Sequence, residues 1–199
     1  MDAKRTAFVG ILSALGIVLS AISLNIAPVL NTVGQGGAAL DLSHIATFVA
    51  AISGGPIVGA LVGLLGGLYA GYHFGFVFGQ GLVAVVGVPL GKAMTGLMAG
   101  LLYKKLRIGN GSKHSFLAIP ATLVSYVPES IYTVLYFLYI VTLVNGQGMA
   151  YLVPVVIPKG WVEIIVMSIL MGALAGNAGF REFISRFLHT QKADRSTDK

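Results

Sequence analysis

Long uncharged stretches are the feature of this sequence that most restricts its fold. No Asp, Glu, Lys or Arg occurs between Arg5 and Asp41, and none occurs over residues 42–91. A helix that crosses the roughly 30 Å of bilayer hydrocarbon needs about 20 mostly apolar residues. Only 10% of all residues are charged, against about 25% in soluble domains, and the mean hydropathy is +0.86. These values predict an integral membrane protein in a lipid bilayer and exclude a soluble enzyme, a nucleic-acid binder and a disordered chain.

The charges and turn residues divide the chain into a single all-α membrane domain, residues 1–190, followed by a short tail, 191–199. Six membrane helices are expected, at residues 6–26, 42–54, 56–72, 82–104, 116–143 and 160–188. The Gly54-Gly55-Pro56 turn separates the second from the third, because Pro ends one helix and is tolerated in the first turn of the next. The second is short for a full crossing of the membrane. A tilted, interfacial or partly re-entrant placement of this helix is therefore an alternative.

The distribution of cations predicts the orientation. If both termini are cytoplasmic, eleven of the 13 Lys and Arg residues lie on the cytoplasmic side, namely Lys4, Arg5, Lys104, Lys105, Arg107, Lys113, Arg181, Arg186, Lys192, Arg195 and Lys199. This bias follows the positive-inside rule. The outer connections would then be residues 27–41, 73–81 and 144–159, and their length predicts an outward-facing pocket.

Small residues form two ridges at helical spacing. The ridge in the third expected helix contains Gly55, Gly59, Gly63, Gly67 and Gly71. Residues four apart share one helix face, so this ridge predicts a neighbouring helix at close range within the chain. The ridge in the first helix contains Ala3, Ala7, Gly10 and Ala14 and lies near its cytoplasmic end. It is expected either to pack internally or to dock a helix of another protein.

An ionisable residue inside the membrane is expensive and is a candidate for function. Glu129 lies near the middle of the fifth expected helix and shares a helix face with Ser125, Tyr132 and Tyr136. A carboxylate, a hydroxyl and phenols on one face suit a small aromatic or polar ligand. The alternative is an ion pair between Glu129 and Lys92, inside the fourth helix, that only ties two helices together.

Further candidates lie at the outer ends of the expected helices. Glu163 is expected to pair with Lys159 one turn earlier or to face the pocket. Trp161 beside it is typical of the interfacial aromatic belt, and it is also kept as a substrate-binding candidate. His73 closes the third helix and is a candidate of the same kind. His73, Asp41 and His44 match no metal-ligand spacing, so no metal and no cofactor are expected.

No catalytic set of residues is present in the sequence. The segment 87–93, GVPLGKA, lacks both the spacing and the hydroxyl of a phosphate-binding loop. The chain is therefore expected not to be an enzyme and not to hydrolyse ATP. If it takes part in ATP-driven transport, another subunit supplies the energy.

Three segments resemble the substrate-binding S components of energy-coupling factor (ECF) transporters, which are parts of ABC-type transport complexes. They are residues 3–20, AKRTAFVGILSALGIVLS, residues 40–45, LDLSHI, and residues 54–66, GGPIVGALVGLLG. The resemblance implies a six-helix protein in the cell membrane of a prokaryote that captures a vitamin or related micronutrient from outside. It also implies two kinds of partner, a transmembrane coupling subunit and a pair of cytoplasmic ATPase subunits.

The resemblance also implies roles for particular residues. In the family an Ala-x-x-x-Ala pattern on the first helix docks the coupling subunit; the literal match here is Ala3 and Ala7, and the relaxed match is Gly10 and Ala14. The family's ligand lies between the outer loops and the outer halves of the last three helices. That region contains Lys92, Glu129, Tyr132, Tyr136 and Glu163. The Met-His start of the cobalt and nickel members is absent, because the chain begins Met1-Asp2.

Two functions remain open from the sequence. The first is a vitamin-binding transport subunit, whose carboxylates and Tyr residues favour an aromatic ligand with cationic or donor groups, such as a thiamine-like or pyrimidine compound. The second is a stand-alone small membrane carrier or a partner-binding membrane protein.

Overall fold

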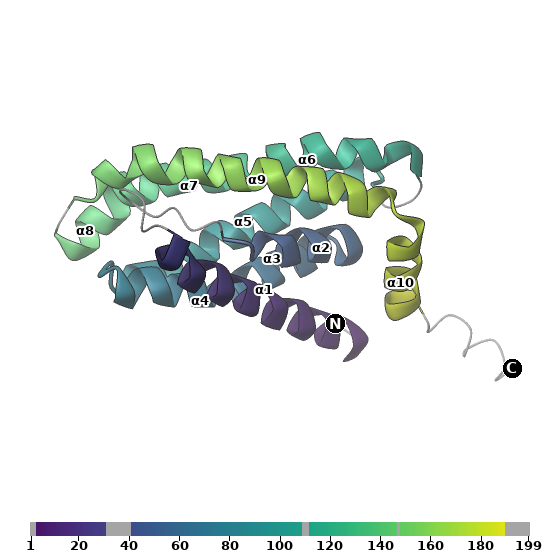
Figure 1. Cartoon of the computed structure of the whole chain (residues 1–199), viewed down its shortest axis with the longest axis horizontal. Coiled ribbons are helices and arrows are strands. Elements are labelled where there is room, and N and C mark those ends of the chain that lie inside the picture. The colour runs from purple at the N-terminus through teal and green to yellow at the C-terminus, as the bar shows by residue number, and fades with distance from the viewer. Residues whose placement is uncertain (1–2, 31–40, 109–111, 147, 190–199) are drawn as a thin grey trace, which may run out of the picture.

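Every regular element in the described part of the chain, residues 3–30, 41–108, 112–146 and 148–189, is a helix. The computed structural model arranges these helices as an elongated bundle (Figure 1). The α-helices are α1 (Ala3–Leu30), α2 (His44–Gly54), α3 (Pro56–Gly66), α4 (Leu68–Tyr72), α5 (Leu82–Lys105), α6 (Ala118–Ser125), α7 (Val127–Leu135), α8 (Val141–Asn145), α9 (Val153–Gly176) and α10 (Ala178–His189). Shorter turns of π- or 3₁₀-helix join them at η1 (His73–Val77), η2 (Ser112–Leu117), η3 (Tyr136–Ile140) and η4 (Ala150–Leu152).

Five helical runs among the described residues are long and apolar enough to cross a membrane. They are Ala3–Asn25, Pro56–Val77, Leu82–Lys105, Ser115–Asn145 and Ala150–Gly176. These runs confirm the predicted all-α, polytopic membrane fold. The remaining apolar helix, α2, has 11 residues and is about 16 Å long at 1.5 Å per residue. It therefore covers only about half of the hydrocarbon thickness.

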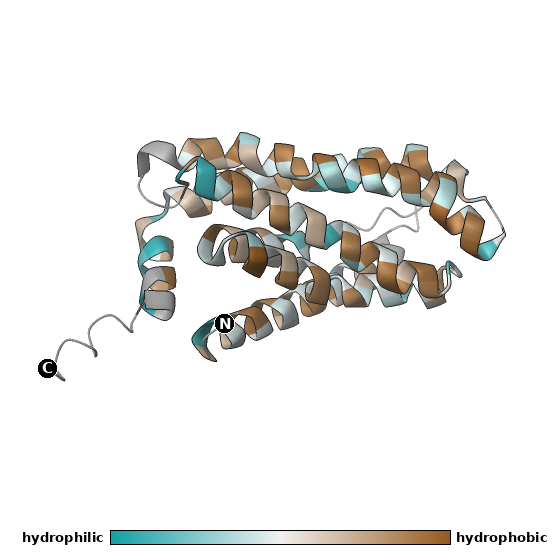
Figure 2. Ribbon diagram, turned by 180° about the vertical axis from the view of Figure 1, so that it is seen from behind, coloured by the Kyte–Doolittle hydropathy of each residue, from teal (hydrophilic) through white to brown (hydrophobic). Residues whose placement is uncertain are grey.

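The surface of the bundle is apolar along the length of the long helices (Figure 2). Large aliphatic side chains are among the most exposed, with Ile57 at 68%, Leu82 at 72% and Leu143 at 83%. Soluble proteins rarely leave apolar patches of this extent facing water. Lipid tails solvate such a surface, which agrees with the membrane fold.

The predicted bounds of the sixth helix, residues 160–188, are wrong at both ends. α9 starts earlier, at Val153, and the backbone leaves the helix at Asn177, where ψ is 119°. The Asn177 side-chain oxygen then accepts a hydrogen bond from the Phe180 N–H at 2.9 Å. This contact caps α10, which turns across the end of the bundle where the N-terminus lies (Figure 1). The expected outer loop 144–159 is correspondingly mostly helical.

The other expected boundaries agree more closely. The fourth helix is α5, and the fifth is the broken run from Ser115 to Asn145. The first is longer than expected because α1 continues to Leu30, and the third continues through η1. The Gly55 turn is confirmed, with φ at +83° and Pro56 opening α3. Residues 31–40 of the first outer connection and 190–199 of the tail lie outside the described residues.

The glycine ridge of α3 packs against α5, as predicted. A Cβ added at Gly63 would lie 2.4 Å from the carbonyl oxygen of Lys92. One added at Gly96, on α5, would lie 2.2 Å from the carbonyl oxygen of Gly59. The two backbones are therefore too close for any side chain, and this contact fixes Lys92 relative to α3.

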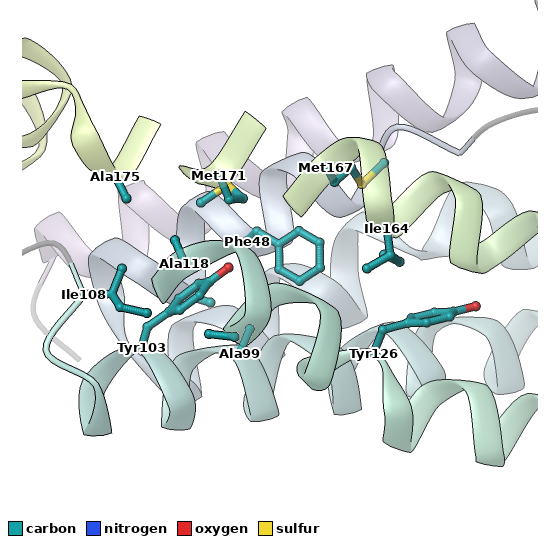
Figure 3. Packing of buried hydrophobic residues seen from close by; sticks show 12 residues of the cluster. Phe48, Ala99, Tyr103, Ile108, Ala118, Tyr126, Ile164, Met167, Met171 and Ala175 are labelled. Carbon is teal, nitrogen blue, oxygen red and sulfur yellow. The ribbon is translucent and has the colours of Figure 1, made fainter. Parts of the chain in front are cut away.

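A cluster of buried residues fills the half of the bundle nearer the termini. It joins α2, α5, α6 and α9 through residues that include Phe48, Ala99, Tyr103, Ile164 and Met171 (Figure 3). The Tyr103 hydroxyl is satisfied there by the Thr122 hydroxyl at 2.5 Å. This half of the bundle is held together by apolar packing between these four helices.

We expect Gly63→Ala to lower the free energy of unfolding by about 1–3 kcal/mol, because the added methyl group forces two backbones apart. Thermal unfolding of the purified protein in detergent measures the change. Gly10→Ala is the matched control, since nothing lies within 4 Å of a Cβ at that position. Equal stability of the two variants would contradict the close α3–α5 contact.

Candidate functional site

A cavity of about 360 Å³ lies between α2, α5, α7 and α9, and η1, η3 and η4 also contribute to its walls. The volume is within the range of small-molecule sites, roughly 300–1,000 Å³. Charged residues meet at one end of the cavity, and aromatic residues line its sides.

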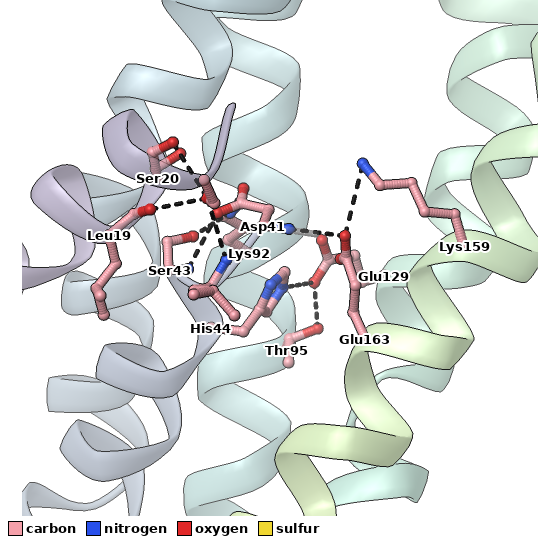
Figure 4. A network of polar contacts seen from close by, with 12 residues as sticks. Leu19, Ser20, Asp41, Ser43, His44, Lys92, Thr95, Glu129, Lys159 and Glu163 are labelled. Carbon is pink, nitrogen blue, oxygen red and sulfur yellow. Dashed lines mark hydrogen bonds and ion pairs between the residues drawn. The ribbon is translucent and has the colours of Figure 1, made fainter. Parts of the chain in front are cut away.

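The first buried ion pair connects the start of α2 to α5. Lys92 donates to Asp41 and to the Ser43 hydroxyl, and the Ser43 N–H donates to the other Asp41 oxygen at 3.0 Å (Figure 4). Burial raises the pKa of the Asp41 carboxyl, but the Lys92 ammonium, the His44 ring and the hydrogen bonds from Lys92 and Ser43 together outweigh it and hold the pKa well below its usual range. Asp41 is therefore ionised, and Lys92 is committed to it.

The second buried pair connects α2 to α7. Glu129 Oε2 lies 3.1 Å from His44 Nε2 and accepts a hydrogen bond from the Thr95 hydroxyl at 2.5 Å. The alternative ion pair between Glu129 and Lys92 is not formed, because Lys92 pairs with Asp41 instead. No local pattern predicts Asp41 as the partner of Lys92, because Asp41 precedes the second helix and is distant from Lys92 in the chain.

Glu163 connects the same cluster to α9. Its Oε1 accepts a hydrogen bond from the Asp41 N–H at 2.7 Å and lies 3.5 Å from the Lys159 ammonium (Figure 4). The predicted pairing of Glu163 with Lys159 is confirmed. The start of α2 is thus held by charged side chains from α5, α7 and α9.

Aromatic rings form the sides of the cavity. The Tyr132 and Tyr136 rings lie 6.0 Å apart between centroids and are tilted by 37°. They lie against Gly91 and Gly87 of α5, where a Cβ would clash with or crowd them. The Tyr136 hydroxyl donates to the Gln80 side-chain oxygen at 3.3 Å. Pro128 lies in the first turn of α7, directly after the break between α6 and α7 at Tyr126.

Five of the eight predicted substrate-binding residues line the cavity, and three do not. Those that line it are Lys92, Glu129, Tyr132, Tyr136 and Glu163. Ser125 precedes the helix break at Tyr126 and does not line the cavity; its hydroxyl donates to the Thr122 carbonyl at 2.7 Å.

The other two misplaced predictions, Trp161 and His73, pack against cavity residues from behind. Trp161 meets the Tyr126 ring edge-on at 5.3 Å. His73 is buried and lies 5.3 Å from the Phe78 ring. Neither lines the cavity.

Sequence reasoning missed several lining residues. Asp41 and His44 were weighed only as metal ligands, and among the described residues no three His, Asp or Glu side chains are placed to hold a metal. Gln80, Tyr126 and Lys159 were not selected as substrate contacts. Only their position in the sequence could have indicated this role. Each lies near the outer end of an expected helix or one helical turn from Glu129 or Glu163.

The small-residue ridge of α1 is not covered by the rest of the described chain. Ala3, Ala7, Gly10 and Ala14 are all exposed. The opposite face of α1 packs inward, where a Cβ at Gly16 would lie 3.1 Å from Gly66. Internal packing, one of the two expectations, therefore does not account for the ridge.

The family of the protein follows from a comparison of the whole chain. Residues 4–175 match the model of the family described as ECF transporter, substrate-specific component. The chain belongs to this family, which is a family of transport components and not of enzymes. It is a multi-pass membrane protein and a substrate-binding subunit of ECF transporters. No match was found among curated proteins or among solved structures.

We expect Lys92→Met to destabilise the protein by about 3–5 kcal/mol, because it leaves the Asp41 carboxylate buried and unpaired. The double variant Lys92→Met with Asp41→Asn should regain part of this loss. Thermal unfolding of both variants measures it. A single variant as stable as wild type would contradict a structural role for the pair.

Proposed function

We propose that this chain captures a vitamin or vitamin precursor from the outer side of the plasma membrane of a prokaryote. The ligand is an aromatic compound with cationic or donor groups, of thiamine-like or pyrimidine type. Transport inward then requires a transmembrane coupling subunit and two cytoplasmic ATPase subunits. The membrane domain of residues 1–190 provides the binding site, and residues 191–199 form a cytoplasmic tail.

The cavity is the observation that carries this proposal. Its sides are aromatic, which suits a flat ring, and its charged end contains Asp41, Glu129 and Glu163. A small number of polar groups in an otherwise apolar pocket is typical of small-molecule sites. The charged groups are already held in place by one another, so the site is formed before a ligand arrives.

The position of the cavity supports capture from outside. Its lining residues come from the end of the bundle opposite the N-terminus and α10 (Figure 1). Most Lys and Arg residues lie at the end with the termini, which the positive-inside rule assigns to the cytoplasm. The site therefore opens toward the outer half of the membrane.

The exposed ridge of α1 supports the proposed partner. A smooth surface of Ala and Gly allows another helix to approach closely within the bilayer. The ridge starts at Ala3 and continues through Ala14, on the half of α1 nearer the cytoplasmic end. We assign it to the coupling subunit, through which ATP hydrolysis by the other subunits reaches this chain.

We expect Glu129→Gln to weaken vitamin binding by about 10- to 100-fold, since a hydrogen bond to a charged group contributes roughly 1.5–3 kcal/mol. Ligand-induced thermal stabilisation against a vitamin panel, followed by titration calorimetry, measures the effect. Glu182→Gln is the control, because Glu182 is exposed on α10 and pairs with Arg186. If no vitamin stabilises the wild-type protein and no ATPase subunits co-purify, the stand-alone carrier becomes the better account.

We expect Ala14→Trp to abolish vitamin uptake by the assembled transporter while leaving vitamin binding intact, because the indole blocks the approach of the coupling helix. Uptake into proteoliposomes and binding to the isolated chain measure the two activities. Ile169→Trp, on the exposed face of α9 where Ile169 is 61% exposed, is the matched control. Normal uptake by the Ala14→Trp variant would contradict the assignment of α1 as the docking face.

A further inference from the structure

The formal charges of the groups that line the cavity do not sum to zero when the His44 ring is neutral. These groups are three carboxylates, two ammonium groups and one imidazole, from Asp41, Glu129, Glu163, Lys92, Lys159 and His44. If the imidazole is neutral, the cavity carries one negative charge in excess. The hydrogen bonds of each group decide where that charge resides.

Two of the carboxylates have a cation of their own. Asp41 is paired with Lys92, and Glu163 lies 3.5 Å from Lys159. Glu129 differs, because its neighbours are the His44 ring and the Thr95 hydroxyl, and neither is a permanent cation. Glu129 therefore has no permanently charged group bonded to it, and the state of the His44 ring decides whether its charge is paired directly.

The second ring nitrogen of His44 decides this state. Nδ1 is buried and has no hydrogen-bond partner in the described part of the chain. In the imidazolium form both nitrogens carry hydrogens, so a buried Nδ1–H would be left without an acceptor, which is unfavourable. A neutral ring with its hydrogen on Nε2 donates to Glu129 and leaves only a lone pair at Nδ1. In that form His44 donates to Glu129 through Nε2.

Glu129 consequently keeps its negative charge and one open oxygen. Both of its protein partners bond to Oε2, and no described residue bonds to Oε1. Glu129 lines the cavity, and the Tyr132 ring lies in the same wall, one turn further along α7. An aromatic ring beside a carboxylate is a favourable setting for an organic cation, since its face attracts positive charge.

We propose that Glu129 determines the specificity of the cavity by selecting an aromatic ligand whose head group carries a single positive charge over its neutral isostere. His44 and Thr95 are positioning residues that hold Oε2 so that Oε1 is presented to the ligand. This proposal rests on the proposed function and adds to it the charge of the ligand and the atom that recognises it.

Benzamidine and benzamide provide a direct test, because they have the same size and aromatic ring and differ by one charge. Binding of each to the full chain in detergent is measured by calorimetry. We expect benzamidine to bind wild type about tenfold or more tightly than benzamide, as for a charge-assisted hydrogen bond. Glu129→Gln should remove this preference, and the control Glu182→Gln should retain it.

Two variants at Thr95 provide a second, independent test of the proposal. Thr95→Val removes the hydrogen bond to Glu129 without changing the size of the side chain, and it should reduce the preference several-fold. Thr95→Ser keeps the hydroxyl and should restore it. A loss of binding caused only by altered packing would affect both ligands equally and leave their ratio unchanged. The Thr95 pair also decides the question if Glu129→Gln does not fold.

The proposal is overturned if wild type binds the two compounds equally, if it binds neither, or if the preference survives Glu129→Gln. A neutral or anionic vitamin that binds the cavity and is insensitive to Glu129→Gln would also overturn it, while leaving the proposed function intact. Failure of the proposed function has a different signature, which is the absence of any bound or transported vitamin.

Discussion

Pairing of buried charges in a membrane-embedded bundle is the interaction on which the site depends. An ionisable side chain away from water is costly unless its charge is compensated. Here the compensation runs through the start of α2, where Asp41 pairs with Lys92 and its N–H donates to Glu163. One short segment therefore collects side chains from α5 and α9, and His44, one turn later, adds Glu129 from α7. The end of the cavity is the meeting point of these contacts.

The small residues of the chain have two separate roles. On α3 and α5, Gly59, Gly63 and Gly96 bring backbones into direct contact and so fix the depth and direction of Lys92. On α1, the Ala and Gly ridge is exposed. The same residue types thus build a rigid scaffold on one helix pair and an unoccupied surface on another.

The sequence predicted the helical membrane fold well, because long uncharged runs and Pro56 are local signals. It predicted the end of the last spanning helix poorly. Gly172 and Gly176 look like a continuing ridge, whereas the break depends on the extended backbone at Asn177 and on its cap of α10. A cap of this kind is visible only once the direction of both helices is known.

The site was predictable in part for similar reasons. Glu129, Tyr132 and Tyr136 follow helical spacing along one stretch, and all three line the cavity. Ser125 obeys the same spacing but is separated from them by the break at Tyr126, where periodicity loses its meaning. The partners Asp41 and His44 come from a distant segment, and no local pattern links them to Lys92 or Glu129.

The central claim is that this cavity holds a small aromatic molecule. Native mass spectrometry of the purified protein, released gently from detergent, tests it most directly. We expect one small molecule bound per chain, either co-purified or acquired when a vitamin panel is added, and a lower bound fraction in Glu129→Gln. A wild-type protein that emerges empty and takes up none of the vitamins would contradict it.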